Sequence, residues 1–241
     1  MNNKQLYNLE IHEALHQLGS SQHGLDSTTA SHRLKQYGPN ELTAKKTPLW
    51  KRIIEPFASY FAIVIIAAAL LSVYEKKWFE AGIISIILVV NAVIFYFQQF
   101  SVGRVLKTLR AQDKQNVDVI RGNHTHSVAS NKLVPGDLIH VTEGMKIPAD
   151  GRLIDVSHLQ ADESLLTGES LPIHKIAGAI AGKQEVYDQK NMLFKGTYIR
   201  AGTGLLLITQ TGNNTQLGTI NKLAAEADEG KTPVEQKIDD L

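Results

Sequence analysis

The segment ADESLLTGESLPIHK, residues 161–175, carries the strongest functional signal in the chain. At its centre lie Thr167, Gly168, Glu169 and Ser170, so a carboxylate directly follows a glycine between two hydroxyl residues. Because glycine has no Cβ, the backbone here can turn with a positive φ or approach another surface closely. The pattern therefore predicts a polar loop that presents Glu169 outward, near a phosphate or a water. The alternative is a surface turn with one solvated glutamate, since short motifs also occur by chance.

Several short motifs occur in a fixed order on either side of this segment. They are VPGD (134–137), PADG (148–151), DES (162–164), NMLFKGT (191–197) and KTPVEQK (231–237). In this order and at these spacings the set resembles the actuator domain of P-type ATPases, the cation pumps that form an aspartyl-phosphate. The resemblance runs from about Gly24 to the last residue and is far more specific than any one motif.

The N-terminal region predicts two helices. Leu6, Leu9, Leu15 and Leu18 form one apolar stripe that ends near Gly19. A second helix is expected between a cap at Asp26-Ser27 and a stop at Gly38-Pro39. Gly24-Leu25, Arg33-Leu34 and YGPNEL (37–42) resemble the N-terminal cytosolic segment of calcium, sodium/potassium and proton pumps. His12 and His16 lie four residues apart, but metal ligation would need further partners, so a solvated face is favoured and no metal site is predicted.

Two long segments contain no charged residue. They cover Pro56–Tyr74, 19 residues, and Ala81–Gly103, 23 residues, and only residues 75–80 separate them. A helix needs about 20 largely apolar residues to cross a bilayer, so the pattern predicts a transmembrane hairpin rather than two buried helices of a soluble protein. More Lys and Arg residues flank the outer ends than the connecting turn, which places both ends in the cytoplasm.

The composition excludes several classes of protein. The 241 residues have a net charge of +1, which argues against a nucleic-acid partner. The absence of cysteine excludes disulfides and thiolate metal sites, and it disfavours the heavy-metal branch of the pump family. The first apolar run begins far from Met1, so no cleavable signal peptide is apparent.

Short strand-like runs bounded by Gly or Pro dominate residues 115–210. They are Val117–Ile120, Asp137–Val141, Gly151–Val156, Tyr198–Arg200 and Leu205–Thr209, and the Gly202-Thr203-Gly204 step is expected to be a turn or a bulge. Such runs predict an all-β unit, followed by a helix over 215–227. The resemblance implies a distorted jelly roll docked against the N-terminal helices. The expected fold class is an α+β membrane protein fragment that combines this actuator domain and its flanking helices with the transmembrane hairpin.

Four regions follow from these patterns. Residues 1–50 are the cytosolic N-terminal helical segment, which is expected to be part of the actuator domain. Residues 51–110 are the hairpin, 111–230 the actuator β-domain, and 231–241 a linker toward a third membrane helix. The motif DKTGT, which carries the phosphorylated aspartate in the family, does not occur. We therefore expect a chain that corresponds to the first quarter to third of a pump and does not hydrolyse ATP alone.

The resemblance assigns roles to the loop residues. Glu169 orients and partly deprotonates the water that hydrolyses the aspartyl-phosphate. Gly168 allows a close approach, Thr167 and Ser170 hold the loop or contact phosphate oxygens, and Asp162 fixes the start of the loop. Pro135, Gly136, Asp137, Pro148, Asp150 and Gly151 shape turns.

The resemblance also implies cofactors and partners. ATP and Mg²⁺ act in the full-length pump but are not bound by this chain alone. The partners are the lipid bilayer of the plasma membrane, the phosphorylation and nucleotide-binding domains of the same pump, and the transported cation. The N-terminal segment and the 231–237 motif favour calcium, although Ala58-Ser59 replace acidic residues found in some animal calcium pumps. The alternatives are a pump for protons or another monovalent cation, and a non-enzymatic, membrane-anchored scaffold.

Overall fold

The computed structural model describes residues 3–42, 54, 57, 60–112, 115–168 and 171–228. The chain divides into two compact units. One unit combines residues 1–43 with 114–241 and contains the β-sheet, and the other covers residues 44–113 and contains two long helices. The two segments of the first unit are therefore far apart in sequence but belong to one folded body.

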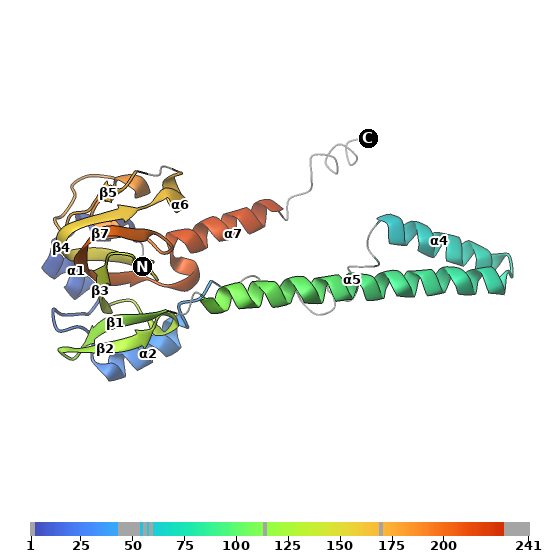
Figure 1. Cartoon of the computed structure of the whole chain (residues 1–241), viewed down its shortest axis with the longest axis horizontal. Helices are drawn as coiled ribbons and strands as arrows, with labels where there is room; N and C mark the ends of the chain where they lie inside the picture. Colours follow the sequence, from blue (N-terminus) through green and yellow to red (C-terminus); the bar gives the residue numbers. More distant parts are fainter. Residues whose placement is uncertain are drawn as a thin grey trace. The chain divides into compact units, whose positions relative to one another are not determined.

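A seven-stranded antiparallel sheet forms the centre of the first unit, with the order β2-β1-β3-β7-β4-β5 and with β6 paired to β4 (Figure 1). Its strands are β1 (Asn116–Arg121), β2 (His124–Ala129), β3 (Leu138–Thr142), β4 (Asp150–Asp162), β5 (Ile173–His174), β6 (Met192–Leu193) and β7 (Tyr198–Gln210). The short helices of this unit are η1 (Asn3–Asn8), α1 (Ile11–Gln17), α2 (Ser27–Tyr37), η3 (Ser130–Lys132), α6 (Ser164–Thr167), η4 (Val186–Asp188), η5 (Gly212–Asn214) and α7 (Gln216–Asp228). Helices around an antiparallel sheet place the unit in the predicted α+β class.

The longest pairing in the sheet joins β4 and β7, each of 13 residues. The sequence predicts two strands in place of β7, but the chain continues through Gly202 without a break. The register of the pair shifts between Ser157 and Gln160, and His158 has a φ of +50°. A Cβ on Gly202 would lie 2.4 Å from the carbonyl oxygens of Ser157 and His158. Glycine is therefore required here because it faces a β-bulge in the neighbouring strand.

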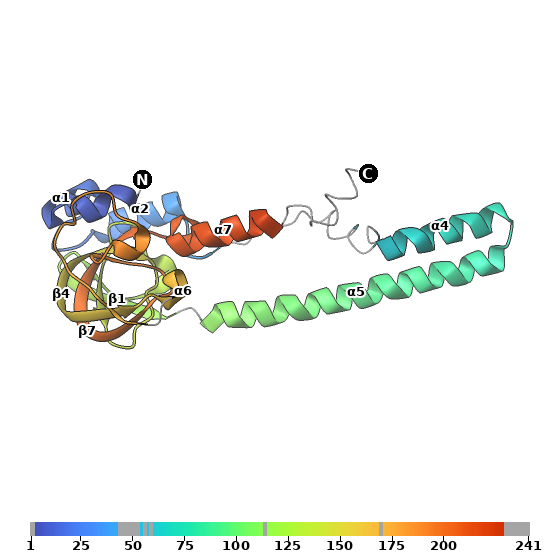
Figure 2. The same cartoon turned by 90° about the horizontal axis from the view of Figure 1, so that it is seen from above.

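The N-terminal helices cover one side of the sheet, as Figure 2 shows. Leu6, Leu15 and Leu18 are buried in one cluster with Leu138 of β3 and Leu207 of β7. The predicted single helix is divided between η1 and α1, and α1 begins after Glu10, whose N–H donates to the Glu13 carboxylate at 3.1 Å. The predicted apolar stripe thus packs against the sheet, although it belongs to two short helices rather than one.

Local capping signals place α2 where the sequence predicts it. The Asp26 carboxylate accepts a hydrogen bond from the Thr29 N–H at 2.7 Å, and Gly38 ends the helix with a φ of +75°. Both features satisfy backbone groups that a helix terminus leaves free. Helix α7 begins and ends within one residue of the predicted 215–227 range.

The second unit contains α4 (Tyr60–Tyr74) and α5 (Trp78–Gln112), which pack against each other. The connecting turn covers only residues 75–77, so the predicted turn residues Trp78, Phe79 and Glu80 lie in the first turn of α5. The segment Trp78–Phe97 is long and apolar enough to cross a membrane, with a mean hydropathy of 2.2. The apolar part of α4 that the structure describes, Ala62–Tyr74, is shorter. Pro56, the predicted start of the first span, lies outside the described residues.

Candidate functional site

The candidate loop leaves the sheet at the end of β4 and returns at β5. Gln160 pairs with His174 and Ala161 pairs with Ile173, so the two ends of the loop are joined by sheet hydrogen bonds. Of the four predicted site residues, Thr167 and Gly168 lie at the end of α6 and are described. Glu169 and Ser170 lie outside the described residues.

Helix α6 is a single turn that is bonded to the backbone of Glu163. The N–H groups of Leu166 and Thr167 donate to the Glu163 carbonyl at 2.8 and 3.1 Å, and the Thr167 hydroxyl also donates to it at 3.2 Å. The Gly168 N–H closes the turn by donating to the Ser164 carbonyl at 2.9 Å. Hydrogen bonds therefore hold the backbone from Glu163 to Gly168.

Gly168 ends α6 in the left-handed region, with φ +76° and ψ −5°. Residues with a Cβ adopt this conformation at a cost of about 1 kcal/mol or more, which explains the glycine. A Cβ at this position would meet nothing within 4 Å among the described residues, and Gly168 is exposed. Packing against the described residues therefore does not require a glycine here, and the space beside it is open with respect to them.

Asp162 anchors the start of the loop. Its carboxylate accepts hydrogen bonds from the Ser164 N–H at 3.0 Å and from the Arg200 guanidinium at 3.0 and 2.5 Å. The hydrogen bonds from Ser164, followed by those from Arg200, lower the pKa of Asp162 to about 2. Asp162 therefore keeps its charge at neutral pH and ties α6 to β7. Arg200 was not predicted, because it lies 38 residues away in sequence.

A second ion pair lies directly behind the loop. The Glu163 carboxylate and the Lys175 ammonium are 2.5 Å apart, and their side chains are 1% and 0% exposed. Burial raises the pKa of Glu163 and lowers the pKa of Lys175, while the charge of each partner opposes both shifts. The Lys175 nitrogen also lies 6.0 Å from the centroid of the Phe194 ring. No sequence pattern assigned a role to this pair.

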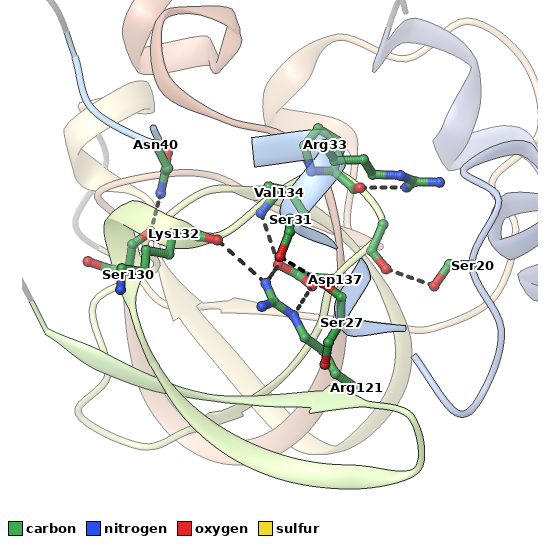
Figure 3. A network of polar contacts seen from close by, with 12 residues as sticks. Ser20, Ser27, Ser31, Arg33, Asn40, Arg121, Ser130, Lys132, Val134 and Asp137 are labelled. Carbon is green, nitrogen blue, oxygen red and sulfur yellow. Dashed lines mark hydrogen bonds and ion pairs between the residues drawn. The ribbon is translucent and has the colours of Figure 1, made fainter. Parts of the chain in front are cut away.

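The N-terminal segment docks on the VPGD turn, residues 134–137 (Figure 3). Asp137 is fully buried, accepts two hydrogen bonds from Arg121 at 2.8 and 2.7 Å, and accepts another from the Val134 N–H at 2.9 Å. The Ser20 hydroxyl donates to the Gly136 carbonyl at 2.7 Å, and the Arg33 guanidinium donates to the Pro135 carbonyl at 2.6 Å. These residues were predicted only to shape turns, but they also fix the N-terminal helices to the sheet.

Asp150 of the PADG motif joins three parts of the unit. Its two carboxylate oxygens accept hydrogen bonds from the N–H groups of Lys195 at 2.8 Å and Gln216 at 2.7 Å. It therefore caps the start of α7 and holds the NMLFKGT motif. Burial raises the pKa of Asp150 to about 7, although both hydrogen bonds oppose this shift.

Asn40 connects the end of the N-terminal segment to the residues around the PADG and NMLFKGT motifs. Its amide nitrogen donates to the carbonyls of Ser130 and Pro148 at 3.0 and 2.9 Å. Its amide oxygen accepts from the Lys195 ammonium at 3.1 Å and from the Gly212 N–H at 2.8 Å. The buried Asn40 amide, which both donates and accepts hydrogen bonds, thus explains the conformation of the YGPNEL motif.

The described residues contain no group of three or more His, Asp or Glu side chains that could hold a metal ion. His12 and His16, which were considered as ligands, are both exposed on α1.

Comparison with known proteins places the chain in a family. The model described as the P-type ATPase actuator domain matches residues 111–225. The model described as the cation transporter/ATPase N-terminus matches residues 6–72. Together they cover the sheet, the N-terminal helices from residue 6 onward, and α4 up to residue 72.

The relatives are transport ATPases. The "Calcium-transporting ATPase 1" of Bacillus cereus is 38% identical over 225 residues, which is 91% of this chain and 25% of the relative. The "Calcium-transporting ATPase 1" of Lactococcus lactis is 32% identical over 236 residues, or 98% of this chain and 27% of the relative. The "Probable cation-transporting ATPase F" of Mycobacterium bovis is 34% identical over 234 residues, or 96% of this chain and 26% of the relative.

The fold and these matches define an actuator unit with its N-terminal segment. The chain belongs to the P-type ATPases and carries the N-terminal and actuator regions of that family. It spans about a quarter of the length of the curated relatives that it matches.

Proposed function

We propose that this chain is the actuator portion of an ATP-driven cation pump, and that the loop after β4 promotes hydrolysis of the pump's aspartyl-phosphate. Glu169 is the proposed general base. It orients a water in line with the phosphorus and accepts a proton as the water oxygen bonds to phosphorus and the bond to the aspartate oxygen breaks. Thr167 and Ser170 hold the loop or contact phosphate oxygens. The nucleophilic aspartate and the sites for ATP and Mg²⁺ belong to other domains of the pump, so this chain alone is expected to be inactive.

The open tip at Gly168 is the observation that carries this proposal. The helical turn before it is bonded to Glu163, and the start of the loop is anchored through Asp162 and Arg200. A Cβ built on Gly168 would have no atom of the described residues within 4 Å. A rigid turn that ends at an exposed glycine can approach a phosphorylated group on another domain closely. Positioning of this kind supplies most of the catalysis in phosphoryl transfer.

We further propose that α4 and α5 form the transmembrane hairpin. Only 11% of the most apolar window of α5 is buried within the structure, whereas the core helix of a soluble protein would be mostly buried. Large apolar side chains such as Val64, Leu70 and Val93 are exposed on both helices. Tyr74, Trp78 and Phe79 gather at the connecting turn, as aromatic residues do at a membrane interface. The distorted jelly-roll form of the sheet, the four regions predicted from the sequence, and a plasma-membrane location with cytoplasmic ends are part of the same proposal.

We propose calcium as the transported cation. Two of the relatives are named calcium-transporting, and the third is named only as cation-transporting. Ala58-Ser59, which weakened this prediction, lie outside the described residues. The proton-pump and scaffold alternatives have no comparable support, since no relative above is named for either role.

The experiment for this function uses a chimera in which residues 6–225 of this chain replace the matching region of the Bacillus cereus relative. Membrane vesicles that contain the chimera are expected to take up radiolabelled calcium when ATP is added. Vesicles with Glu169→Gln in the same chimera are the control and are expected to lose nearly all uptake. Equal uptake by both vesicles would refute the proposed role of the loop.

A further inference from the structure

The loop is held at its base by an ion pair that folding alone does not explain. Glu163 precedes α6, and Lys175 follows β5, so the two residues close the segment that contains Thr167 to Ser170. Two charges that are buried together lose their hydration, and a hydrophobic pair of similar size is often at least as stable. Such a pair can instead be retained for the geometry that it imposes.

Hydrogen bonds next to the ion pair couple the position of Glu163 to the loop. The Glu163 carbonyl accepts three hydrogen bonds, from the Leu166 and Thr167 N–H groups and from the Thr167 hydroxyl. A shift of Glu163 therefore moves the whole helical turn that ends at Gly168. The Lys175 backbone is fixed independently, because its N–H donates to the Leu159 carbonyl at 2.9 Å. The ammonium of Lys175 is thus a fixed point against which the Glu163 carboxylate is held.

We propose that the Glu163–Lys175 ion pair is a positioning device that sets the pose of the dephosphorylation loop. This inference rests on the proposed function of the loop and adds two residues to it. Neither side chain can reach a substrate, since both are buried. They act through the Glu163 backbone and α6, and they affect the reaction by setting the alignment of the attacking water. A displacement of about 1 Å at such a site can slow a reaction by roughly a hundredfold.

The test measures two properties of the same set of variants in the chimera. Phosphoenzyme formed from radiolabelled ATP is chased with unlabelled ATP, and its decay is followed. Thermal unfolding is recorded on the purified protein in detergent. Glu163→Gln and Lys175→Met each leave one buried charge unpaired, so each is expected to lower the unfolding temperature and to slow decay roughly tenfold to a hundredfold. Lys175→Arg keeps the cation and is expected to decay within a few-fold of the unmodified chimera.

The double variant Glu163→Gln/Lys175→Met separates positioning from stability. It removes both charges, so its unfolding temperature is expected to recover relative to the single variants, whereas its decay is expected to remain slow. If decay recovers together with stability, the pair acts only through folding and the inference is wrong. Wild-type decay in both single variants would also overturn it.

Two controls make these outcomes specific. Arg121→Met breaks a different ion pair, which Arg121 at the end of β1 forms with Asp137 just before β3, and β7 separates these two strands from β4 in the sheet. It is expected to reduce stability without slowing decay. Glu169→Gln reports on the proposed function itself. Slow decay in Glu169→Gln with normal decay in the pair variants refutes the inference alone, whereas normal decay in Glu169→Gln refutes the proposed function.

Discussion

At the scale of single residues, buried carboxylates organise this unit more than its motifs suggested. Asp137 and Asp150 both stand in Gly- and Pro-containing motifs that were predicted to shape turns. The prediction is right for Pro135 and Gly136, which form a turn before Asp137, but wrong for Asp150 and Gly151, which are the first residues of β4. The hydrogen-bond partners of the two carboxylates, Arg121 and Gln216, lie 16 and 66 residues away in sequence. A local pattern can predict a turn because turn geometry depends on neighbouring residues, but it contains no information about a distant donor.

Asp150 gives the unit a dependence of stability on pH. Its pKa in the folded state is about 7, above the value of 3.8 for an unperturbed aspartate. The folded state therefore binds the proton more tightly, and this contribution to stability is complete below about pH 4, declines as the pH rises, and is lost above about pH 7. The shift corresponds to at most about 4 kcal/mol. The measurement is thermal unfolding of the detergent-solubilised chain from pH 4 to pH 8, with Asp150→Asn as the variant that cannot titrate. A stability difference between the two proteins that does not change with pH would contradict this expectation.

At the scale of elements, the sequence predicted what is encoded locally. Asp26 and Gly38 marked α2, and short strand-like runs bounded by Gly or Pro marked β1 and β3. Strand β2 was missed because HTHSVA has no apolar alternation, and it exists through its pairing with β1 along all six residues. The two-residue strands β5 and β6 are likewise too short to carry a pattern of their own. The role of the loop was predicted from its motif and stays a prediction, whereas the contacts of Arg200 and of the Glu163–Lys175 pair could be found only from the fold.

The hairpin of α4 and α5 makes a prediction about topology. The turn between the helices contains Lys76 and Lys77, and the bias of basic residues toward the outer ends predicts that this turn lies outside the cell. The chain has no cysteine, so single cysteines can be introduced without background. In intact cells, an impermeant thiol reagent is expected to label Lys76→Cys but not Asn123→Cys. Labelling of Asn123→Cys alone would show the opposite orientation.

At the scale of the whole molecule, the sheet and the N-terminal segment form one folding unit. Arg152 is fully buried, and its guanidinium donates to the carbonyls of Leu6 and Leu9 at 3.3 Å each. The N-terminal helices also cover Leu138 and Leu207. Without this segment, the sheet would expose apolar side chains and leave part of a buried cation without acceptors. These contacts indicate that residues 111–228 do not form a complete folding unit without the N-terminal segment.

This organisation predicts the behaviour of two soluble proteins. The N–H of Asn40 donates to the Asn131 carbonyl, and the N–H of the adjacent Ser130 donates to the Gln115 carbonyl, so the two segments meet at one place. A short Gly/Ser linker between residues 42 and 115 is therefore expected to give a folded β-rich domain. The matched protein that lacks residues 3–42 is expected to melt at least about 10 °C lower, because a few kcal/mol are lost. Circular dichroism melts compare the two, and equal melting temperatures would contradict the role given to the N-terminal segment.

The central claim is that Glu169 activates the water that hydrolyses the aspartyl-phosphate. Decay of the radiolabelled phosphoenzyme in the Glu169→Gln chimera tests it most directly, because this substitution keeps the size of the side chain and removes the base. Phosphorylation by ATP is expected to proceed normally, since it uses groups on other domains. The loss of a general base is expected to slow decay by about a hundredfold to ten-thousandfold. Decay at the rate of the unmodified chimera would contradict the account and leave the loop with a structural role only.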